Sequence, residues 1–119
     1  MRELGDEYEE RAAQWLQDRG LRLLTRNFQC RTGEIDIIAM DGDCLVFIEV
    51  RARNNPRYAS AAESVDRRKQ HRLTRTAQMY LKTHPANANL PCRFDVVTFE
   101  PRQSADRIDI NWIRSAFST

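Results

Sequence analysis

The sequence contains no apolar run that approaches the roughly 20 residues required to cross a membrane. Its acidic N-terminal stretch, GDEYEE, lacks the basic and then apolar layout of a signal peptide. We therefore expect a soluble, cytoplasmic protein that does not bind a membrane.

Cysteine and histidine are also scarce. Cys30, Cys44 and Cys92 are an odd number of thiols without a CxxC pair, and the distant His71 and His84 cannot complete a zinc-finger pattern. A disulfide scaffold and a structural zinc site are therefore not expected. Repeats, low-complexity tracts and interdomain linkers are missing too, and 119 residues of which 41% are hydrophobic fit a single domain over residues 1–119.

Lysine is rare compared with arginine, because 17 of the 19 basic residues are Arg and only Lys69 and Lys82 are Lys. The planar guanidinium forms bidentate contacts suited to phosphate, although a genome-wide codon bias explains the same preference. The charges are also segregated: residues 1–50 carry a net charge of −5 and residues 51–75 one of +6. A basic middle segment therefore follows an acidic half.

Two segments have the apolar spacing of amphipathic helices. Apolar residues at positions 8, 12, 15 and 16 predict a helix over residues 5–20, with Gly20 as its stop. Apolar residues at positions 73, 77, 80 and 81 predict a second helix, which begins after Asp66 as N-cap and ends before His84-Pro85. The second helix carries most of the basic cluster.

Five further segments have strand character. In chain order they cover residues 21–28, 33–40, 44–52, 92–100 and 107–112. Asp41-Gly42-Asp43 separates the second from the third and predicts a β-hairpin, and residues 113–117 are expected to form a final helical turn. The predicted order is α-β-β-β-α-β-β, an α/β domain with a mixed sheet flanked by helices.

Alternation along this hairpin brings acidic side chains together. Glu34 and Asp36 lie on one face of their strand, with the apolar positions 35, 37 and 39 on the other, while Glu49 and Arg51 share a face of the next strand. A two-residue turn at positions 41 and 42 places Glu34 opposite Glu49, whereas a four-residue loop places Asp36 opposite Glu49. Either loop brings Asp36, Glu49 and Arg51 close enough for two carboxylates to share a divalent cation.

A structural interpretation of these residues stays open. Facing carboxylates repel each other, so a cation or a salt bridge must compensate them. Ion pairs of Glu49 with Arg51, or of Glu34 with a helix arginine, on a solvated face of the sheet also meet this requirement.

Several motifs together resemble the YraN family of small bacterial proteins, over most of the chain. They are GEIDIIA, FIEVRAR, the helix pattern Gly5…Glu9-x-x-Ala12-Ala13-x-x-Leu16, Lys69-x-x-Arg72-Leu73…Tyr80-Leu81 and Arg93-Phe94-Asp95-Val96-Val97. That family is similar to the restriction-endonuclease-like superfamily of PD-(D/E)xK nucleases and to archaeal Holliday junction resolvases. The resemblance implies a restriction-endonuclease-like core of order α-β-β-β-α-β and a metal-dependent phosphodiesterase site.

The resemblance also assigns residues to that site. The acid of the superfamily's first motif strand corresponds to Asp36, the D/E of its D/E-x-K pattern to Glu49, and its helix-borne acid to Glu9. The lysine of that pattern is replaced by Arg51, and a guanidinium can stabilise charge but can hardly accept a proton from water. Lys69, at the start of the second helix, is either a substitute for that lysine or a solvated residue.

The cofactor follows from these ligands. Asp36 and Glu49, with Glu9 and the Val50 carbonyl, are expected to hold Mg²⁺ or Mn²⁺ because hard cations prefer oxygen ligands. The fixed charge of Arg51 predicts that this binding is weak and that cleavage is slow. Glu34 either assists the site or orients an arginine.

The basic segment predicts DNA as the partner, and the resolvase resemblance adds branched DNA. No base-reading motif accompanies the basic residues, so shape rather than sequence is the expected preference. The predicted contacts are Arg53, Arg57, Arg67, Arg68, Lys69, Arg72 and Arg75. A solvated, charged helix is the plainer interpretation of the same residues.

Three functions therefore remain open. The first is a divalent-metal-dependent nuclease that acts on DNA, and the second is a nucleic-acid-binding protein of the same fold that has lost catalysis. The third is a protein-interaction module with surface ion pairs. A homodimer is compatible with all three.

Overall fold

The computed structural model describes residues 4–52, 61–101 and 108–118. Its elements are α1 (Leu4–Asp18), β1 (Arg22–Cys30), β2 (Gly33–Asp41), β3 (Cys44–Ala52), the 3-10 turn η1 (Ala62–Ser64), α2 (Arg67–Thr83), the 3-10 turn η2 (Pro85–Asn87), β4 (Cys92–Pro101) and β5 (Ile108–Phe117). The predicted mixed α/β class and the order of its helices and strands are confirmed. No helix within the described ranges is long and apolar enough to span a membrane.

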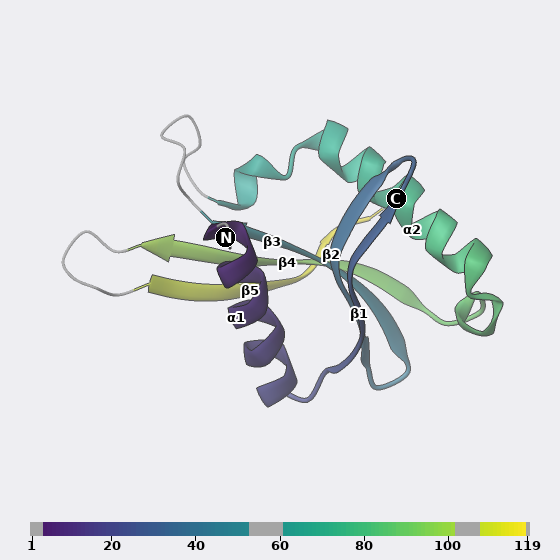
Figure 1. Ribbon diagram of the computed structural model, residues 1–119, viewed down its shortest axis with the longest axis horizontal. Coiled ribbons are helices and arrows are strands. Elements are labelled where there is room, and N and C mark those ends of the chain that lie inside the picture. The colour runs from purple at the N-terminus through teal and green to yellow at the C-terminus, as the bar shows by residue number, and fades with distance from the viewer. Residues whose placement is uncertain (1–3, 53–60, 102–107, 119) are drawn as a thin grey trace.

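The five strands form one mixed sheet in the order β1-β2-β3-β4-β5. Only β3 and β4 are parallel, and the other neighbours are antiparallel. Parallel neighbours need a long crossover, and the chain makes it through α2 (Figure 1).

The two helices cover opposite faces of the sheet (Figure 1). Period-two alternation in β3 explains this, because positions 46, 48 and 50 pack in the apolar cluster with α1, whereas positions 45 and 47 pack in the cluster with α2. The α1 cluster includes Ala12 and Leu16, and the α2 cluster includes Leu73 and Tyr80.

The ends of the helices follow the predicted signals. The Asp66 side chain caps α2 by accepting a hydrogen bond from the Lys69 backbone N–H at 3.0 Å. Helix α1 is followed by Gly20, which has a φ of 99° that residues with a side chain rarely adopt. The cap at Asp66 fixes the first residue of α2, and the apolar residues Leu73, Ala77 and Tyr80 turn one side of the helix to the sheet.

The hairpin has the register predicted for the four-residue loop, but it closes with a two-residue turn that lies one residue later than the predicted two-residue turn. Asp41 pairs with Cys44, so Gly42 and Asp43 form the two-residue turn, and Gly42 adopts the left-handed φ of 59° that such turns require. The resulting register places Met40 opposite Leu45. This is the register in which Asp36, rather than Glu34, comes opposite Glu49.

The predicted helical turn over residues 113–117 is wrong. β5 continues as a strand, and Phe117 pairs with Phe94. The register shifts between Phe94 and Val96, and Ser115 takes a φ of 49° opposite this shift. This irregularity interrupts the strand's alternation, which is why the sequence pattern did not indicate a strand.

A buried carboxylate holds this irregular part of the sheet together. Asp95 is 1% exposed and accepts hydrogen bonds from Trp112 Nε1 at 2.8 Å and from the Ser115 N–H at 2.9 Å. Arg93 Nε lies 3.1 Å from both of its oxygens, and Arg93 Nη2 continues to Asp41 at 2.7 Å. Asp95 therefore joins β4 to β5, and through Arg93 to the hairpin turn.

We expect Asp95→Ala to lower the free energy of unfolding by about 3 to 5 kcal/mol, because it leaves Arg93 Nε, the Trp112 indole N–H and the Ser115 N–H without their acceptor. Urea denaturation measures this loss. Asp43→Ala, at an exposed turn position, is the control and should cost less than about 1 kcal/mol. Equal losses for the two variants would contradict the role assigned to Asp95.

Candidate metal and phosphate site

The site forms where β2 separates from β3. Ladder pairs between these strands end at Ile37 and Ile48, although both strands continue. Asp36 lies in the gap that opens there, and its Oδ2 accepts a hydrogen bond from the Val50 backbone N–H at 2.8 Å. The carboxylate thus replaces a strand carbonyl as the partner of this amide.

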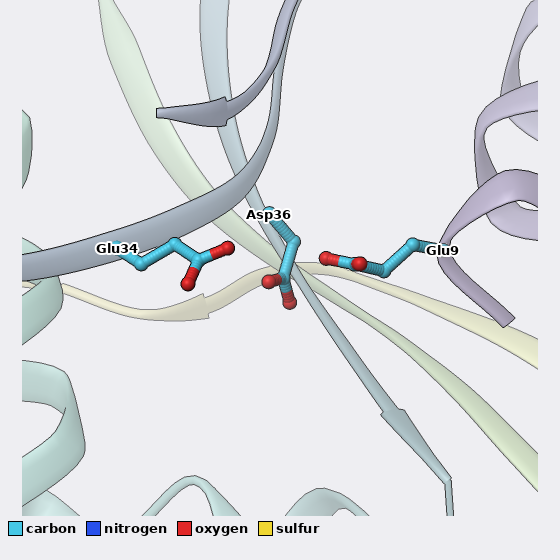
Figure 2. Close-up of side chains that lie close together, drawn as sticks. All are labelled: Glu9, Glu34 and Asp36. Carbon is cyan, nitrogen blue, oxygen red and sulfur yellow. The ribbon is translucent and has the colours of Figure 1, made fainter. Parts of the chain in front are cut away.

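Three carboxylates, one from α1 and two from β2, meet around this gap. Figure 2 shows Glu34 and Glu9 pointing toward Asp36 from opposite sides. Single oxygens of the three residues all lie within 4.8 Å of one another. Glu9 comes from α1, so the site depends on the packing of that helix against the sheet.

Glu49 extends the acidic group toward α2. It is 3% exposed and contacts Asp36, and its Oε2 lies 2.8 Å from Lys69 Nζ. Arg51 Nη1 is 3.9 Å from the same oxygen, while Arg51 Nε donates to Ser64 Oγ at 2.8 Å. The predicted ion pair between Glu49 and Arg51 is therefore present, but it does not lie on a solvated face, since Glu49 is buried, and the closer cation is Lys69.

Burial raises the pKa of both central carboxyls. Desolvation raises the pKa of Glu49 to about 8, and the adjacent Asp36 adds to the shift while Lys69 opposes it. Desolvation also raises the pKa of Asp36 to about 6; its contacts with Glu49 and the Val50 N–H lower this pKa, and Glu9 raises it. The metal-free pair therefore retains a proton at neutral pH.

These residues line one cleft with a volume of about 440 Å³. The cleft contains all of the residues to which the sequence assigned chemistry in the described ranges: Glu9, Asp36, Glu49, Val50, Arg51 and Lys69, with Glu34, Gly33, Arg72 and Leu73 beside them. Lys69 is not a solvated residue at the start of the helix, because its side chain is 27% exposed and paired. Its ammonium lies on the cleft side of α2.

The described basic residues predicted to contact DNA line more than one hollow along α2. Arg68, Arg72 and Arg75 line a second cleft of about 630 Å³ together with His71. Arg67 lines a different hollow, formed with the C-terminal end of β5. Arg53 and Arg57 lie outside the described residues.

Sequence reasoning missed the contribution of β1. Asn27 lies opposite Asp36, because its neighbours Arg26 and Phe28 pair with Ile37 and Ile35. It has a left-handed φ of 54°. An isolated asparagine within a strand pattern is a weak signal for such a conformation, since asparagine is depleted in strands and tolerates positive φ.

The side chains of β2 do not all lie on the predicted faces of the sheet. Ile35 was expected on the face of residues 37 and 39, but it packs in the α2 cluster, whereas Ile37 and Ala39 pack in the α1 cluster. The alternation breaks at Asp36, where the left-handed Asn27 lies opposite and β2 has left β3. This break allows Asp36 to contact acids from both sides of the sheet.

Comparison with known proteins identifies relatives along nearly the whole chain. The profile of the Uncharacterised protein family UPF0102 matches residues 8–99. The chain belongs to the UPF0102 family. The UPF0102 protein of Stutzerimonas stutzeri is 49% identical over 115 residues, covering 97% of this chain and 94% of its own. That of Alcanivorax borkumensis is 48% identical, covering 95% and 90%, and that of Nitrosococcus oceani is 47% identical, covering 98% and 92%.

The match confirms the resemblance to the YraN family, which is the UPF0102 family. The matched region begins at Tyr8 in α1, the helix that carries Glu9, and ends at Phe99 within β4. All residues that line the acidic cleft of this UPF0102 protein therefore lie within the family region.

The raised pKa values predict a stability that falls with pH in EDTA. Both carboxyls bind protons more tightly when folded than when unfolded, so the free energy of unfolding decreases as the pH rises from about 4 to about 8. We expect Asp36→Asn to reduce this decrease by about 1 to 3 kcal/mol, because a neutral amide beside Glu49 no longer disfavours its ionisation. Urea denaturation at pH 5 and pH 9 measures the difference, with Asp43→Asn as the exposed control. The same pH dependence in Asp36→Asn and the wild type would rule out this coupling.

Proposed function

We propose that this UPF0102 protein is a divalent-metal-dependent nuclease that hydrolyses phosphodiester bonds in DNA, on a fold of the restriction-endonuclease-like type. One observation carries the proposal. Carboxylates from α1, β2 and β3 converge in a cleft that also holds Lys69 from α2 and Arg51 from β3. The order α1-β1-β2-β3-α2-β4, with β3 parallel to β4, supports the fold part of the proposal.

The donor set fits a hard divalent cation. Asp36 and Glu49 are carboxylates buried against each other, and Glu9 adds a third from the side of α1. Such a group is costly without added positive charge, and Mg²⁺ and Mn²⁺ prefer oxygen ligands of this kind. Asp36, Glu49, Glu9 and the Val50 carbonyl would hold the ion. When bound, the ion supplies a water of lowered pKa and screens the phosphate charge.

Lys69 and Arg51 together would fill the role that the superfamily assigns to one lysine. The Lys69 ammonium lies 2.8 Å from Glu49 Oε2, so it adjoins the reacting region and can stabilise charge on a phosphoryl oxygen or exchange a proton with water. The Nε of Arg51 donates a hydrogen bond to Ser64 Oγ, and a guanidinium is a poor acceptor of protons from water. The guanidinium therefore supplies fixed positive charge beside the same carboxylate.

The surface of α2 supports DNA as the substrate. This helix has no acidic residue and six basic ones in addition to His71. Arg72 lines both the acidic cleft and the basic cleft that it shares with Arg68 and Arg75. Since Arg72 belongs to both clefts, a DNA strand whose phosphates bind in the basic cleft would also lie close to the carboxylates.

The proposal predicts metal-dependent cleavage of a panel of linear, flapped and four-way DNA substrates in Mg²⁺ or Mn²⁺. Asp36→Asn and Lys69→Ala should each reduce the cleavage rate at least about 100-fold, because they remove an ion ligand and the proton-exchanging cation. Lys82→Ala, in the last turn of α2, is the matched control and should cleave like the wild type. Gel-resolved cleavage rates provide the measurement.

Other outcomes distinguish the remaining functions. If Lys69→Ala still cleaves and Arg51→Lys accelerates cleavage, the lysine role belongs to position 51. If the wild type and Arg51→Lys both bind metal and DNA but leave every substrate intact, the protein is a binding protein of this fold and the nuclease proposal is wrong. Absence of DNA binding favours a protein-interaction module.

DNA binding should depend steeply on salt. Combined replacement of Arg68, Arg72 and Arg75 by Ala should weaken binding and reduce the slope of log affinity against log salt by about 2 to 3, because each lost phosphate contact contributes about 0.9. Fluorescence anisotropy of a labelled duplex at several salt concentrations measures the slope. An unchanged slope in the triple variant would exclude the basic cleft as the binding surface.

A further inference from the structure

Asn27 has a backbone conformation that β-strands do not normally contain. Its φ of 54° lies in the left-handed region, in the middle of β1, which is an edge strand of the sheet. Asparagine is one of the few residues with a side chain that enter this region readily. The conformation occurs at the position opposite Asp36.

The Asn27 amide lies between two of the acidic side chains. With its nitrogen turned toward these acceptor-only carboxylates, Nδ2 donates to Glu9 Oε1 and to Glu34 Oε1, at 2.9 Å in each case. One neutral donor group thus joins α1 to β2 across the edge strand. Both carboxylates are the ones that point toward Asp36 from either side (Figure 2).

This arrangement fixes the positions of acids that would otherwise separate. Oxygens of Glu9, Glu34 and Asp36 lie within 4.8 Å of one another, a distance at which like charges repel. The two amide hydrogens hold the outer pair without adding a positive charge, so the attraction of the group for a cation is retained. Partners behind a ligand commonly orient it in this way.

We propose that Asn27 is a positioning residue for cation binding, whose amide holds the Glu9 and Glu34 carboxylates in place beside Asp36. The inference rests on the proposed function, since it assumes that this acidic group takes a divalent cation. It assigns to Glu34 a place beside the bound cation. It also gives a reason for the left-handed backbone, which directs the amide between the two acids.

The test compares Mn²⁺ binding to the full-length wild type, Asn27→Gly and Asn111→Gly, using the electron paramagnetic resonance signal of free Mn²⁺ at pH 8. Glycine keeps the left-handed backbone at position 27 and removes only the amide. Asn111 is an exposed asparagine on β5, the opposite edge strand, so it provides the same chemical change away from the acids. We expect Asn27→Gly to weaken Mn²⁺ binding at least about tenfold and Asn111→Gly to leave it unchanged.

The outcomes separate this inference from the function on which it rests. If the wild type binds Mn²⁺ and Asn27→Gly binds it equally well, the positioning role is overturned while the nuclease proposal stands. If the wild type itself binds no Mn²⁺, the metal-dependent function fails and the inference fails with it. Equal weakening in Asn27→Gly and Asn111→Gly would mean a general loss of fold and would also overturn the inference.

A second variant keeps the inference testable if Asn27→Gly does not fold. Asn27→Asp retains the size of the side chain and replaces the donor by a further carboxylate. Its unfolding temperature in EDTA should fall below that of Asn111→Asp, and Mn²⁺ should restore it. Unfolding temperatures that match those of Asn111→Asp with and without Mn²⁺ would show that the side chain does not face the acids.

Discussion

The contact between the Asp36 and Glu49 carboxylates is the constraint around which this part of the molecule is built. Two acids held together away from water are unfavourable unless neighbouring groups compensate them. Two surrounding elements supply such groups: β3 gives the Val50 N–H to Asp36, and α2 gives Lys69 to Glu49. The separation of β2 from β3 makes room for the pair, so the local break in the sheet and the chemistry of the cleft have the same origin.

The sequence predicted the main features because they depend on short-range periodicity. Alternation along residues 37–52 was enough to bring Asp36, Glu49 and Arg51 together, whereas the apolar spacing of α2 left open whether Lys69 reaches the site, which the structure shows it does. Cap and turn residues located the ends of the helices and the hairpin within one or two residues. Glu9 reaches Asp36 only because α1 packs near β2. Residue spacing did not predict this packing, and the family resemblance alone assigned Glu9 to the site.

The features that escaped prediction depend on partners far away in the chain. The left-handed backbone of Asn27 is stabilised by acids from α1 and β2, and nothing in the neighbouring residues indicates it. The Ser115 N–H likewise donates to the distant Asp95 carboxylate where β5 departs from regular strand geometry, and the pattern of residues 113–117 does not indicate this partner. The separation of Arg67 from Arg68, Arg72 and Arg75 follows from the rotation of α2 against the sheet, which sequence alone determines only approximately.

The Val50 amide gives the site a spectroscopic reporter of its own. Val50 lies within β3, but its N–H donates a hydrogen bond to the Asp36 carboxylate and not to a backbone carbonyl of a neighbouring strand. The proton resonance of this amide therefore responds to the charge on Asp36, in contrast to neighbouring amides that are bonded to carbonyls. The chemical shift of this one backbone amide proton therefore reports the charge on Asp36, and no side chain has to be labelled to measure it.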